Sequence, residues 1–320
     1  MIFLTAIESV LSIVLIIGLG FYLRQAGWFA DTFAANISKL IMNVALPASI
    51  FVSVLTYLNR DKLMSLSDGL LYGALSVVIG YLISWFLVKV LKVRPGRRGV
   101  FINTIVNANT IFIGLPLNVA LFGDVSMPYF LVYYVLNTVS TWAFGALLIA
   151  RDSSDPTQTV EQSQHFDWKK LLPAPLIGFL IALVFLLADI PVPTFIHASL
   201  SYVGAVVTPL SLIYIGIMLC DAGLKSIRFD KDTIAALLGK FVLAPVIMGI
   251  LILIGRTWLP LPAMEAKTLI VQSSVSALAV LPILANEAKG DVQFATNLVT
   301  TSTILFIIVV PLVDALLQFL

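Results

Sequence analysis

Apolar residues fill most of this sequence in long stretches, and polar residues gather in short connections between them. Each stretch has about 20 residues, the length that a helix rising about 1.5 Å per residue needs to cross a hydrocarbon core of about 30 Å. The pattern lacks the alternation that membrane strands require. Windows of low charge predict ten helical segments, at 4–23, 36–58, 69–91, 99–122, 128–150, 170–189, 197–220, 232–255, 266–286 and 293–318.

The composition supports an integral membrane protein. Hydrophobic residues make up 60% of the chain, charged residues make up 11%, and the mean hydropathy is +1.04. The formal net charge of +2 is too small to favour nucleic acid as a partner. The first apolar stretch has neither a basic flank before it nor a small-residue cleavage site after it, so we expect a retained helix. We therefore predict an all-α integral membrane protein with ten transmembrane helices.

Basic residues lie mainly in the connections that follow the odd-numbered segments. The opposite connections carry only Arg60, Lys62, Arg256 and Lys267. Since short cytoplasmic connections retain Lys and Arg, we predict that both termini lie outside the cytoplasm. The protein is expected to be a multi-pass protein of the cell membrane.

Prolines recur at similar positions in the two halves of the chain. About half the chain separates Pro47 from Pro209, and about half separates Pro116 from Pro282. Because each half holds five segments, an odd number, the second half must enter the membrane in the opposite sense, as in the inverted repeats of many transporters. The predicted divisions are a first repeat at 1–150, a cytoplasmic linker at 151–169 and a second, inverted repeat at 170–320.

A proline interrupts one apolar segment in each half, Pro116 in the fourth and Pro282 in the ninth. Proline removes a backbone hydrogen bond and clashes with the carbonyl four residues earlier. It therefore frees polar main chain where lipid cannot satisfy it. Interruptions at corresponding places in two halves indicate the substrate site of a secondary transporter. We predict that the two broken segments cross near the membrane centre.

Amide and hydroxyl side chains surround both predicted interruptions. Asn109 lies about 16 Å from Arg98 along a helix, close to mid-membrane, and Asn107 lies nearer the cytoplasm. These amides either donate to a substrate carboxylate or join the broken helices to each other. Half-helix N-termini favour an anion over a cation. The candidate substrate-binding residues are Asn109, Asn107, Pro116, Gln272, Ser273, Ser276, Pro282, Asn43, Asn137 and Lys240.

Lys240 is the one lysine or arginine placed well inside a predicted segment. Ionisable residues at membrane depth are costly and usually functional. Three roles are compatible with the sequence. The amine attracts an anionic substrate, pairs with Asp68 or another acid, or extends along its stem to the cytoplasmic surface.

Motifs of catalysis are missing from the sequence. It contains no HExxH, no GxSxG, no Gly-rich phosphate loop and no pair of acids inside a predicted segment. The single cysteine, Cys220, excludes an intramolecular disulfide. We expect no enzyme activity, no cofactor and no metal.

Four stretches resemble the auxin efflux carrier family, which includes the plant PIN proteins and shorter bacterial relatives. They read IMNVALPASIF, NTIFIGLP, PLSLIYIGIMLC and VQSSVSALAVLPILANEAKGD. The most specific piece combines Asn109 and Thr110 with Gly114, Leu115 and Pro116. The resemblance covers nearly the whole chain, and the bile acid:sodium symporters are more distantly similar.

The resemblance implies a scaffold of segments 1, 2, 6 and 7 that often dimerises, with Ser49 and its neighbours facing the substrate. Segments 3–5 and 8–10 would form a moving transport domain, and the usual substrates are small organic anions. This sequence departs from the plant proteins by lacking their long central loop. It also has Tyr72 where they carry a lysine four residues after the acid that corresponds to Asp68.

We therefore expect a secondary carrier of a small organic anion, such as an auxin-like acid or a dicarboxylate, that works by alternating access of the elevator type. The alternatives are a sodium-coupled organic anion symporter and a membrane sensor that binds an anion without moving it. The expected partners are the anion, the lipid bilayer and a second copy bound through segments 2 and 7.

Overall fold

The computed structural model describes residues 2–152, 173–223 and 227–316, and the regular elements in these ranges are all helices. Most of the predicted linker at 151–169 lies outside the described residues. Six helical stretches in the described part are long and apolar enough to cross a membrane. They are Phe33–Tyr57, Leu66–Val90, Arg98–Phe122, Asp124–Ala150, Thr194–Ala222 and Lys231–Gly255.

Helical elements occur within all ten predicted ranges. The first half holds α1 (Ile2–Gln25), α2 (Phe33–Leu40), the π-helical turn η1 (Ile41–Ala45), α3 (Leu46–Tyr57), α4 (Arg60–Val90), α5 (Arg98–Val106), the π-helical turn η2 (Thr110–Gly114), α6 (Leu115–Phe122), the 3₁₀ turn η3 (Asp124–Ser126), α7 (Met127–Val139), the π-helical turn η4 (Ser140–Gly145) and α8 (Ala146–Ala150). The second half holds α9 (Ala174–Leu187), α10 (Thr194–Ala205), α11 (Val207–Ala222), α12 (Lys231–Leu238), the π-helical turn η8 (Gly239–Leu243), α13 (Ala244–Gly255), α14 (Ala263–Ser273), α15 (Leu281–Glu287) and α16 (Val292–Leu316). The inverted relation between the halves stays a prediction.

Prolines explain where most of these helices change geometry. A proline cannot donate to the carbonyl four residues earlier, and its ring crowds that carbonyl, so the preceding turn must widen or open. A π-helical turn supplies the extra width. In each case the residue four positions before the proline lies in the altered turn or ends the helix before it. The pairs are Asn43 with Pro47, Phe112 with Pro116, Ala205 with Pro209, Phe241 with Pro245 and Leu278 with Pro282.

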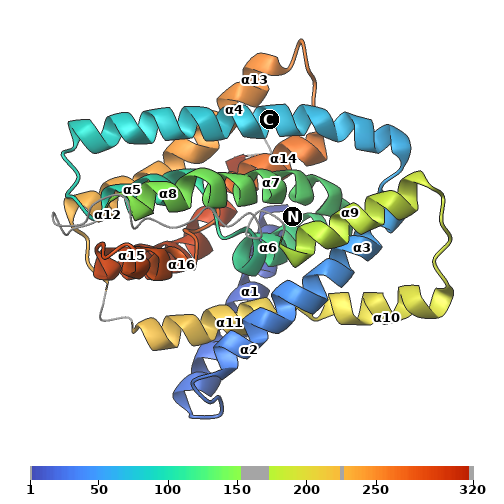
Figure 1. Cartoon of the computed structure of the whole chain (residues 1–320), viewed down its shortest axis with the longest axis horizontal. Helices are drawn as coiled ribbons and strands as arrows, with labels where there is room; N and C mark the ends of the chain where they lie inside the picture. Colours follow the sequence, from blue (N-terminus) through green and yellow to red (C-terminus); the bar gives the residue numbers. More distant parts are fainter. Residues whose placement is uncertain (1, 153–172, 224–226, 317–320) are drawn as a thin grey trace.

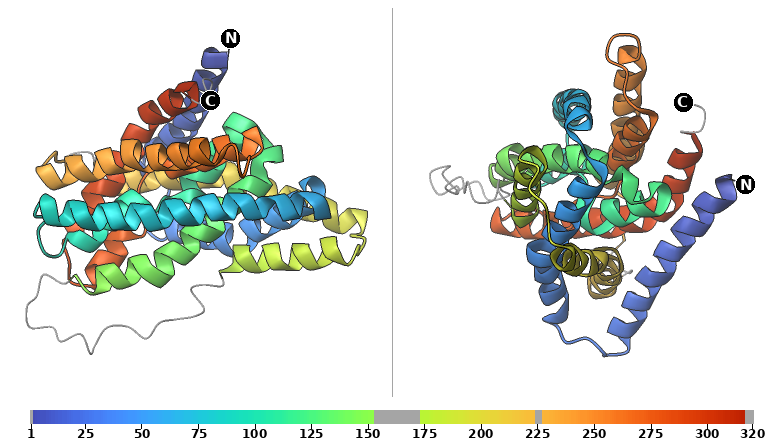
Figure 2. Two further views of the ribbon diagram at one scale, coloured as in Figure 1. Left: turned by 90° about the horizontal axis from the view of Figure 1, so that it is seen from above. Right: turned by 90° about the vertical axis from the view of Figure 1, so that its right-hand side faces the viewer.

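The helices stack in layers between α4 and the pair α2 and α11. Figure 1 shows α4 along one edge, α7 and α14 beneath it, and α11 and α2 toward the opposite edge. The beginning of α1 and the end of α16 lie on the same side of the molecule in both views of Figure 2.

Close packing joins the segments of the predicted scaffold. α1 packs against α11, and α3 packs against α9 and α10. Glycines allow α9 and α10 to approach α3 closely. A Cβ at Gly178 of α9 would lie 2.9 Å from Pro47 Cα, and a Cβ at Gly204 of α10 would lie 2.8 Å from Ser49 Cα. Small residues at such contacts let spanning helices approach closely. Pro47 and Ser49 are thus held against neighbouring backbone.

The fourth and ninth segments are both interrupted. The chain leaves helical geometry at residues 107–109 and again at 274–280. Pro116 and Pro282 do not sit at these points, as the sequence suggested, but in the first turns of α6 and α15. Pro282 lies at a helix start, where proline is well tolerated because that N–H has no intrahelical partner. Pro116 instead follows the π-helical turn η2, which accommodates its ring. Each opening therefore lies upstream of its proline.

Other protein groups form hydrogen bonds with many of the backbone N–H and C=O groups at these interruptions. The Asn109 N–H donates to the Ser276 carbonyl at 2.9 Å, which joins one interruption to the other. Asn137 pairs with both backbone groups of Ala108, accepting from its N–H at 2.8 Å and donating to its carbonyl at 3.0 Å. In the second half, the Ser302 hydroxyl accepts from the Ala277 N–H at 3.0 Å. Helices α7 and α16 therefore hold the two openings in place.

An ion-pair cluster joins three connections at one end of the molecule. Arg97 lies 2.6 Å from a carboxyl oxygen of Asp230 and 2.6 Å from one of Asp291, and its guanidinium stacks over the Phe294 ring. Burial raises the pKa of Asp230, but its hydrogen bonds with Arg97 and Thr233 outweigh this effect and hold that pKa below its usual value. The cluster links the connections before α5, α12 and α16.

The Arg97 cluster generates a prediction about stability and pH. We expect Arg97→Gln to lower stability by about 1–3 kcal/mol, because it leaves partly buried carboxylates without their shared cation. A carboxyl whose pKa is lowered by folding stabilises the folded state at pH values above the usual carboxyl pKa. This stabilisation is lost as the pH falls through the lowered pKa. Thermal unfolding in detergent from acidic to neutral pH should thus show a weaker pH dependence in the variant. Arg94→Gln, an exposed arginine on the same connection, serves as control, and equal effects of both changes would contradict the prediction.

The amide of Asn137 generates a second prediction. Asn137→Leu removes both partners of Ala108 and leaves a buried N–H and a buried carbonyl unpaired, which should cost about 2–6 kcal/mol. Thermal unfolding in detergent measures the change. Asn43→Leu is the matched control, because Asn43 is exposed and its amide donates only to the Lys39 carbonyl of its own helix. We expect the control to change stability by less than about 1 kcal/mol, and a comparable loss in both variants would count against the proposed role of Asn137.

Candidate functional site

A cavity of about 220 Å³ opens beside the interruption of the fourth segment. We call it the Asn109 cavity. It brings together the interruptions of both halves and the helices α2, η1 and α7. Its lining includes Ser38, Met42, Ala108, Asn109, Thr110, Ile111, Phe112, Tyr134, Asn137, Thr138, Thr141, Trp142, Pro173, Leu278, Ala279 and Val280.

Asn109 supplies the main unused polar group of this cavity. Its side-chain oxygen accepts from the Phe112 N–H at 3.3 Å and so caps the helix that begins at Thr110. Its amide nitrogen, Nδ2, is buried and has no hydrogen-bond partner among the described residues. Because a buried donor without a partner is costly, the Nδ2 group is available for a ligand in the cavity.

A second unused group lies across the same cavity on η4. The Thr141 hydroxyl is buried and is likewise unpaired within the described part of the chain. Tyr134 and Trp142 add aromatic walls, and Leu278 adds an apolar one. A cavity with mostly apolar walls and few polar groups suits a small molecule whose polar end must be oriented.

Asn107, in contrast, belongs to a network between helices. Its amide nitrogen donates to Asn103 Oδ1 at 2.8 Å, and its side-chain oxygen accepts from the Ser140 hydroxyl at 2.6 Å. Tyr81 on α4 lies 3.0 Å from the same hydroxyl. These bonds join the fourth segment to the third and fifth segments, and none of them reaches the ninth segment.

Lys240 caps the broken end of α5. The side chain has no exposed surface, and its ammonium donates to the Asn107 carbonyl at 3.0 Å. A cation at this place complements the partial negative charge of a helix C-terminus. Extension of the Lys240 side chain to the surface, one of the three roles expected from the sequence, is therefore wrong. Lys240 does not line the Asn109 cavity, but its amine lies at the interruption.

Gln272 ties the ninth segment to the fourth. Its amide nitrogen donates to the Gly114 carbonyl at 2.8 Å, while its side-chain oxygen has no partner within the described ranges. A Cβ at Gly114 would overlap that oxygen, so only glycine permits this contact. The motif residue Gly114 thus has a steric role.

The other candidates of the ninth segment occupy different environments. Ser273 is buried and its hydroxyl donates to the Ile270 carbonyl at 2.6 Å. The Ser276 carbonyl accepts from the Asn109 N–H, and the buried Ser276 hydroxyl has no partner among the described groups. Pro282 begins α15 and is partly exposed. None of these three lines the Asn109 cavity.

A second cavity, of about 420 Å³, is lined by a later part of the fourth segment, and we call it the Ser49 cavity. Residues of α3, α6, α10 and α11 form its wall. Its lining comprises Ser49, Val52, Ser53, Thr56, Tyr57, Leu115, Val119, Asp124, Met127, Ser201, Gly204, Ala205, Val207 and Thr208. Ser49 therefore faces a cavity, whereas Asn43 lines neither one.

The fourth segment contributes residues to both cavities. Phe112 lines the Asn109 cavity, and Leu115 lines the Ser49 cavity. The Phe112 ring packs against Tyr214 of α11, with ring centroids 4.4 Å apart. The interrupted segment therefore contacts α11 through a residue that lines the Asn109 cavity.

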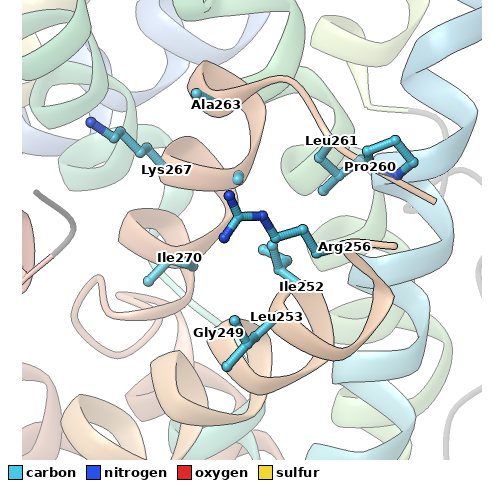
Figure 3. A pocket seen from close by; sticks show the side chains of 10 residues that line it. Gly249, Ile252, Leu253, Arg256, Pro260, Leu261, Ala263, Lys267 and Ile270 are labelled. Atoms are coloured by element: carbon cyan, nitrogen blue, oxygen red, sulfur yellow. The ribbon is translucent and has the colours of Figure 1, made fainter. Parts of the chain in front are cut away.

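A third groove, of about 300 Å³, lies between α13 and α14 and contains none of the predicted site residues. Figure 3 shows the Arg256 side chain extending across this groove toward α14, over Ile252 and Leu253. The groove is separate from the interruptions. The described residues contain no group of three or more His, Cys, Asp or Glu side chains suited to a metal ion.

Several residues of the site were not predicted from the sequence. Asn103 and Tyr81 support Asn107, Ser302 caps the second interruption, and Thr138 and Trp142 line the Asn109 cavity. The near repetition of Ser140-Thr141 as Ser302-Thr303 was the available signal for Ser302. For Tyr81 no local signal exists, because a tyrosine in a spanning segment is equally suited to an interfacial position.

Comparisons with known proteins agree with the resemblance found in the sequence. The chain is 24% identical to an uncharacterized transporter of Methanothermobacter thermautotrophicus over 98% of both chains. It is 19% identical to an uncharacterized transporter of Methanocaldococcus jannaschii over 95% of this chain and 96% of the relative. The model of the membrane transport protein family, which corresponds to the auxin efflux carriers, matches residues 5–313. The chain therefore belongs to the membrane transport protein family and is a multi-pass membrane protein.

Proposed function

We propose that this protein is a secondary carrier of a small organic anion, with the Asn109 cavity as its substrate site. The observation that carries the proposal is the buried amide nitrogen of Asn109, which has no partner among the described residues and belongs to a residue that lines the cavity. An amide N–H is a donor, and carboxylates are acceptors. A carboxylate bound there satisfies the unpaired donor.

The surrounding charge also favours an anion. Lys240 places an ammonium at the carbonyl end of α5, one residue from the cavity-lining Ala108. The helix that begins at Thr110 directs its N-terminus, the positive end of its dipole, toward the same region. The Thr141 hydroxyl adds a further donor. These groups suit an auxin-like acid or a dicarboxylate equally, and we propose the class rather than one compound.

Two cavities lined by different parts of one segment support alternating access. Phe112 lines the Asn109 cavity, and Leu115, three residues later, lines the Ser49 cavity. In the proposed cycle, segments 3–5 and 8–10 move as a unit along the scaffold of segments 1, 2, 6 and 7. The movement changes the residues of α11 that Phe112 contacts. It exposes Asn109 first to one side of the membrane and then to the other.

A sodium-coupled symporter is less well supported. In such a carrier, unwound carbonyls coordinate the cation. Here the Asn107 carbonyl accepts from Lys240, the Ala108 carbonyl accepts from Asn137, and the Ser276 carbonyl accepts from Asn109. Sodium dependence of uptake distinguishes the two carriers, and ligand binding without counterflow of labelled ligand indicates a sensor.

The proposal includes placement and assembly. We place the carrier in the cell membrane with both termini outside the cytoplasm, and we propose a homodimer through segments 2 and 7. Light scattering on the purified protein measures the oligomeric state, and a monomer in mild detergent and in nanodiscs would contradict the dimer.

The amide of Asn109 supplies the test of function. We expect proteoliposomes to take up at least one labelled acid from a panel of malonate, malate, pyruvate and indole-3-acetate. Asn109→Ala should lower the uptake efficiency by about 10- to 100-fold, because a hydrogen bond to a charged group contributes about 1.5–3 kcal/mol. Asn109→Asp should lower it further, because the new carboxylate repels the substrate.

Asn286→Ala is the matched control, since Asn286 is an exposed amide on α15 outside both cavities. We expect this variant to transport like the unchanged protein. Uptake that is insensitive to both Asn109 substitutions would remove Asn109 from the site, and the lack of any uptake across a broad panel of organic acids would overturn the carrier function.

A further inference from the structure

Glu265 is a buried acid that the proposed substrate site does not use. It lies in the first turn of α14 and has no exposed surface. Neither of its carboxyl oxygens has a hydrogen-bond partner in the part of the chain that the structure describes. Removing an unpaired carboxylate from water is far more costly than removing the neutral acid. The environment of Glu265 therefore favours a carboxyl that carries a proton.

The niche around this carboxyl is closely packed. A Cβ at Gly69 of α4 would overlap Glu265 Oε1 and would lie 3.4 Å from Val132 Cγ1 of α7. A side chain at position 69 would therefore displace the carboxyl of Glu265 from its present place. Thr268 lies one turn further along the same face of α14, and its hydroxyl is also buried without a partner among the described residues. The pair forms a small polar site between α4, α7 and α14.

Two titratable groups are close enough to act electrostatically on Glu265. They are Asp68 on α4 and Tyr129 on α7, and both are partly exposed. Neither supplies a positive charge.

Other ionisable groups on the elements packed around α14 are directed elsewhere. The Tyr72 hydroxyl of α4 donates to the Leu259 carbonyl at 2.8 Å. Arg256 and Lys267 line the groove between α13 and α14 (Figure 3). Asp124 of η3 lines the Ser49 cavity. A proton, rather than a neighbouring cation, is therefore the partner that neutralises Glu265.

The charge balance of the proposed moving unit connects this acid to transport. Among the described residues, Lys240 and Glu265 are the Lys, Arg, Asp or Glu side chains with no exposed surface. They lie on η8 and in the first turn of α14, both within that unit. A monovalent anion that enters alone adds one negative charge to the unit, whereas an anion that enters together with one proton adds none. Transfer without an added buried charge is the less costly arrangement in low dielectric.

We propose that Glu265 is a proton-binding site and that one proton travels with each organic anion. The step adds one H⁺ to the carboxylate on the side where substrate binds and returns it to solution where substrate leaves, with no change of redox state. The coupling rests on the proposed carrier function, whereas the protonation of Glu265 does not.

The first experiment measures protonation directly on purified protein. Infrared difference spectra report the C=O stretch of protonated carboxyls, and exposed carboxyls are already ionised near neutral pH. We expect a band that disappears as the pH rises from neutral to alkaline, that is missing in Glu265→Gln and that persists in Glu287→Gln, which changes an exposed acid on α15.

Two results of this experiment overturn the proposal. One is an unchanged band in Glu265→Gln, and the other is the lack of any such band in the unchanged protein. Because glutamine matches the size and neutrality of the protonated acid, Glu265→Gln should fold and elute from size exclusion as the unchanged protein does. A Glu265→Gln variant that does not fold also contradicts the proposal.

The second experiment measures coupling in proteoliposomes with the membrane potential clamped to zero. Each labelled acid of the panel malonate, malate, pyruvate and indole-3-acetate is offered with a pH difference of one unit, acidic outside. One proton per anion predicts accumulation by about tenfold over equilibrium exchange. Glu265→Gln should retain exchange of the labelled acid but lose the accumulation.

The two experiments separate the two proposals. Transport without a response to the pH difference overturns the coupling and leaves the carrier function intact. If no acid of the panel is carried, the coupling fails together with the carrier function for these acids. The infrared result then still decides whether Glu265 binds a proton.

Discussion

The need to satisfy backbone polar groups away from water governs this structure. A continuous helix meets that need internally, and an interrupted one does not. Here two interruptions meet, and each supplies partners to the other, as the hydrogen bond from Asn109 to Ser276 shows. Side chains from neighbouring helices supply more, chiefly Asn137 and Lys240. The tightly packed environment of the candidate site follows from this requirement.

The same requirement separates structural from functional polar residues. Asn107 and Asn137 are saturated by protein groups, so their amides hold the fold. Asn109 and Thr141 retain an unpaired group beside a cavity, and Glu265 retains two unpaired oxygens in a closed niche. Residues of the same type, such as these asparagines, therefore have different roles because their surroundings differ. We assign ligand roles only to the second group, because a ligand or a proton lowers the cost of burying it.

The proposed anion site has no charged lining in the part of the chain that the structure describes, where no arginine or lysine lines the Asn109 cavity. The proposed preference for anions rests instead on a helix N-terminus, two donors and the nearby amine of Lys240. Such a site binds without the strong desolvation cost that a direct buried ion pair carries, which suits a carrier that must release its substrate. The uncompensated acid Glu265 then provides a natural place for the coupling ion.

The sequence by itself determined the helical membrane architecture, the membership in a transport family and the two interrupted segments, because length, hydropathy and proline act locally along the chain. It also made Asn109 a candidate for ligand contact, since an amide at mid-membrane depth beside a proline-containing motif is unusual. Tertiary structure alone decided that the openings lie upstream of Pro116 and Pro282, that Lys240 caps Asn107 and that Glu265 is unpaired. Those outcomes depend on which groups other helices bring into contact, such as Gly69 against Glu265 and Gln272 against Gly114. No local pattern in the chain specifies such contacts, because their partners lie far apart in sequence.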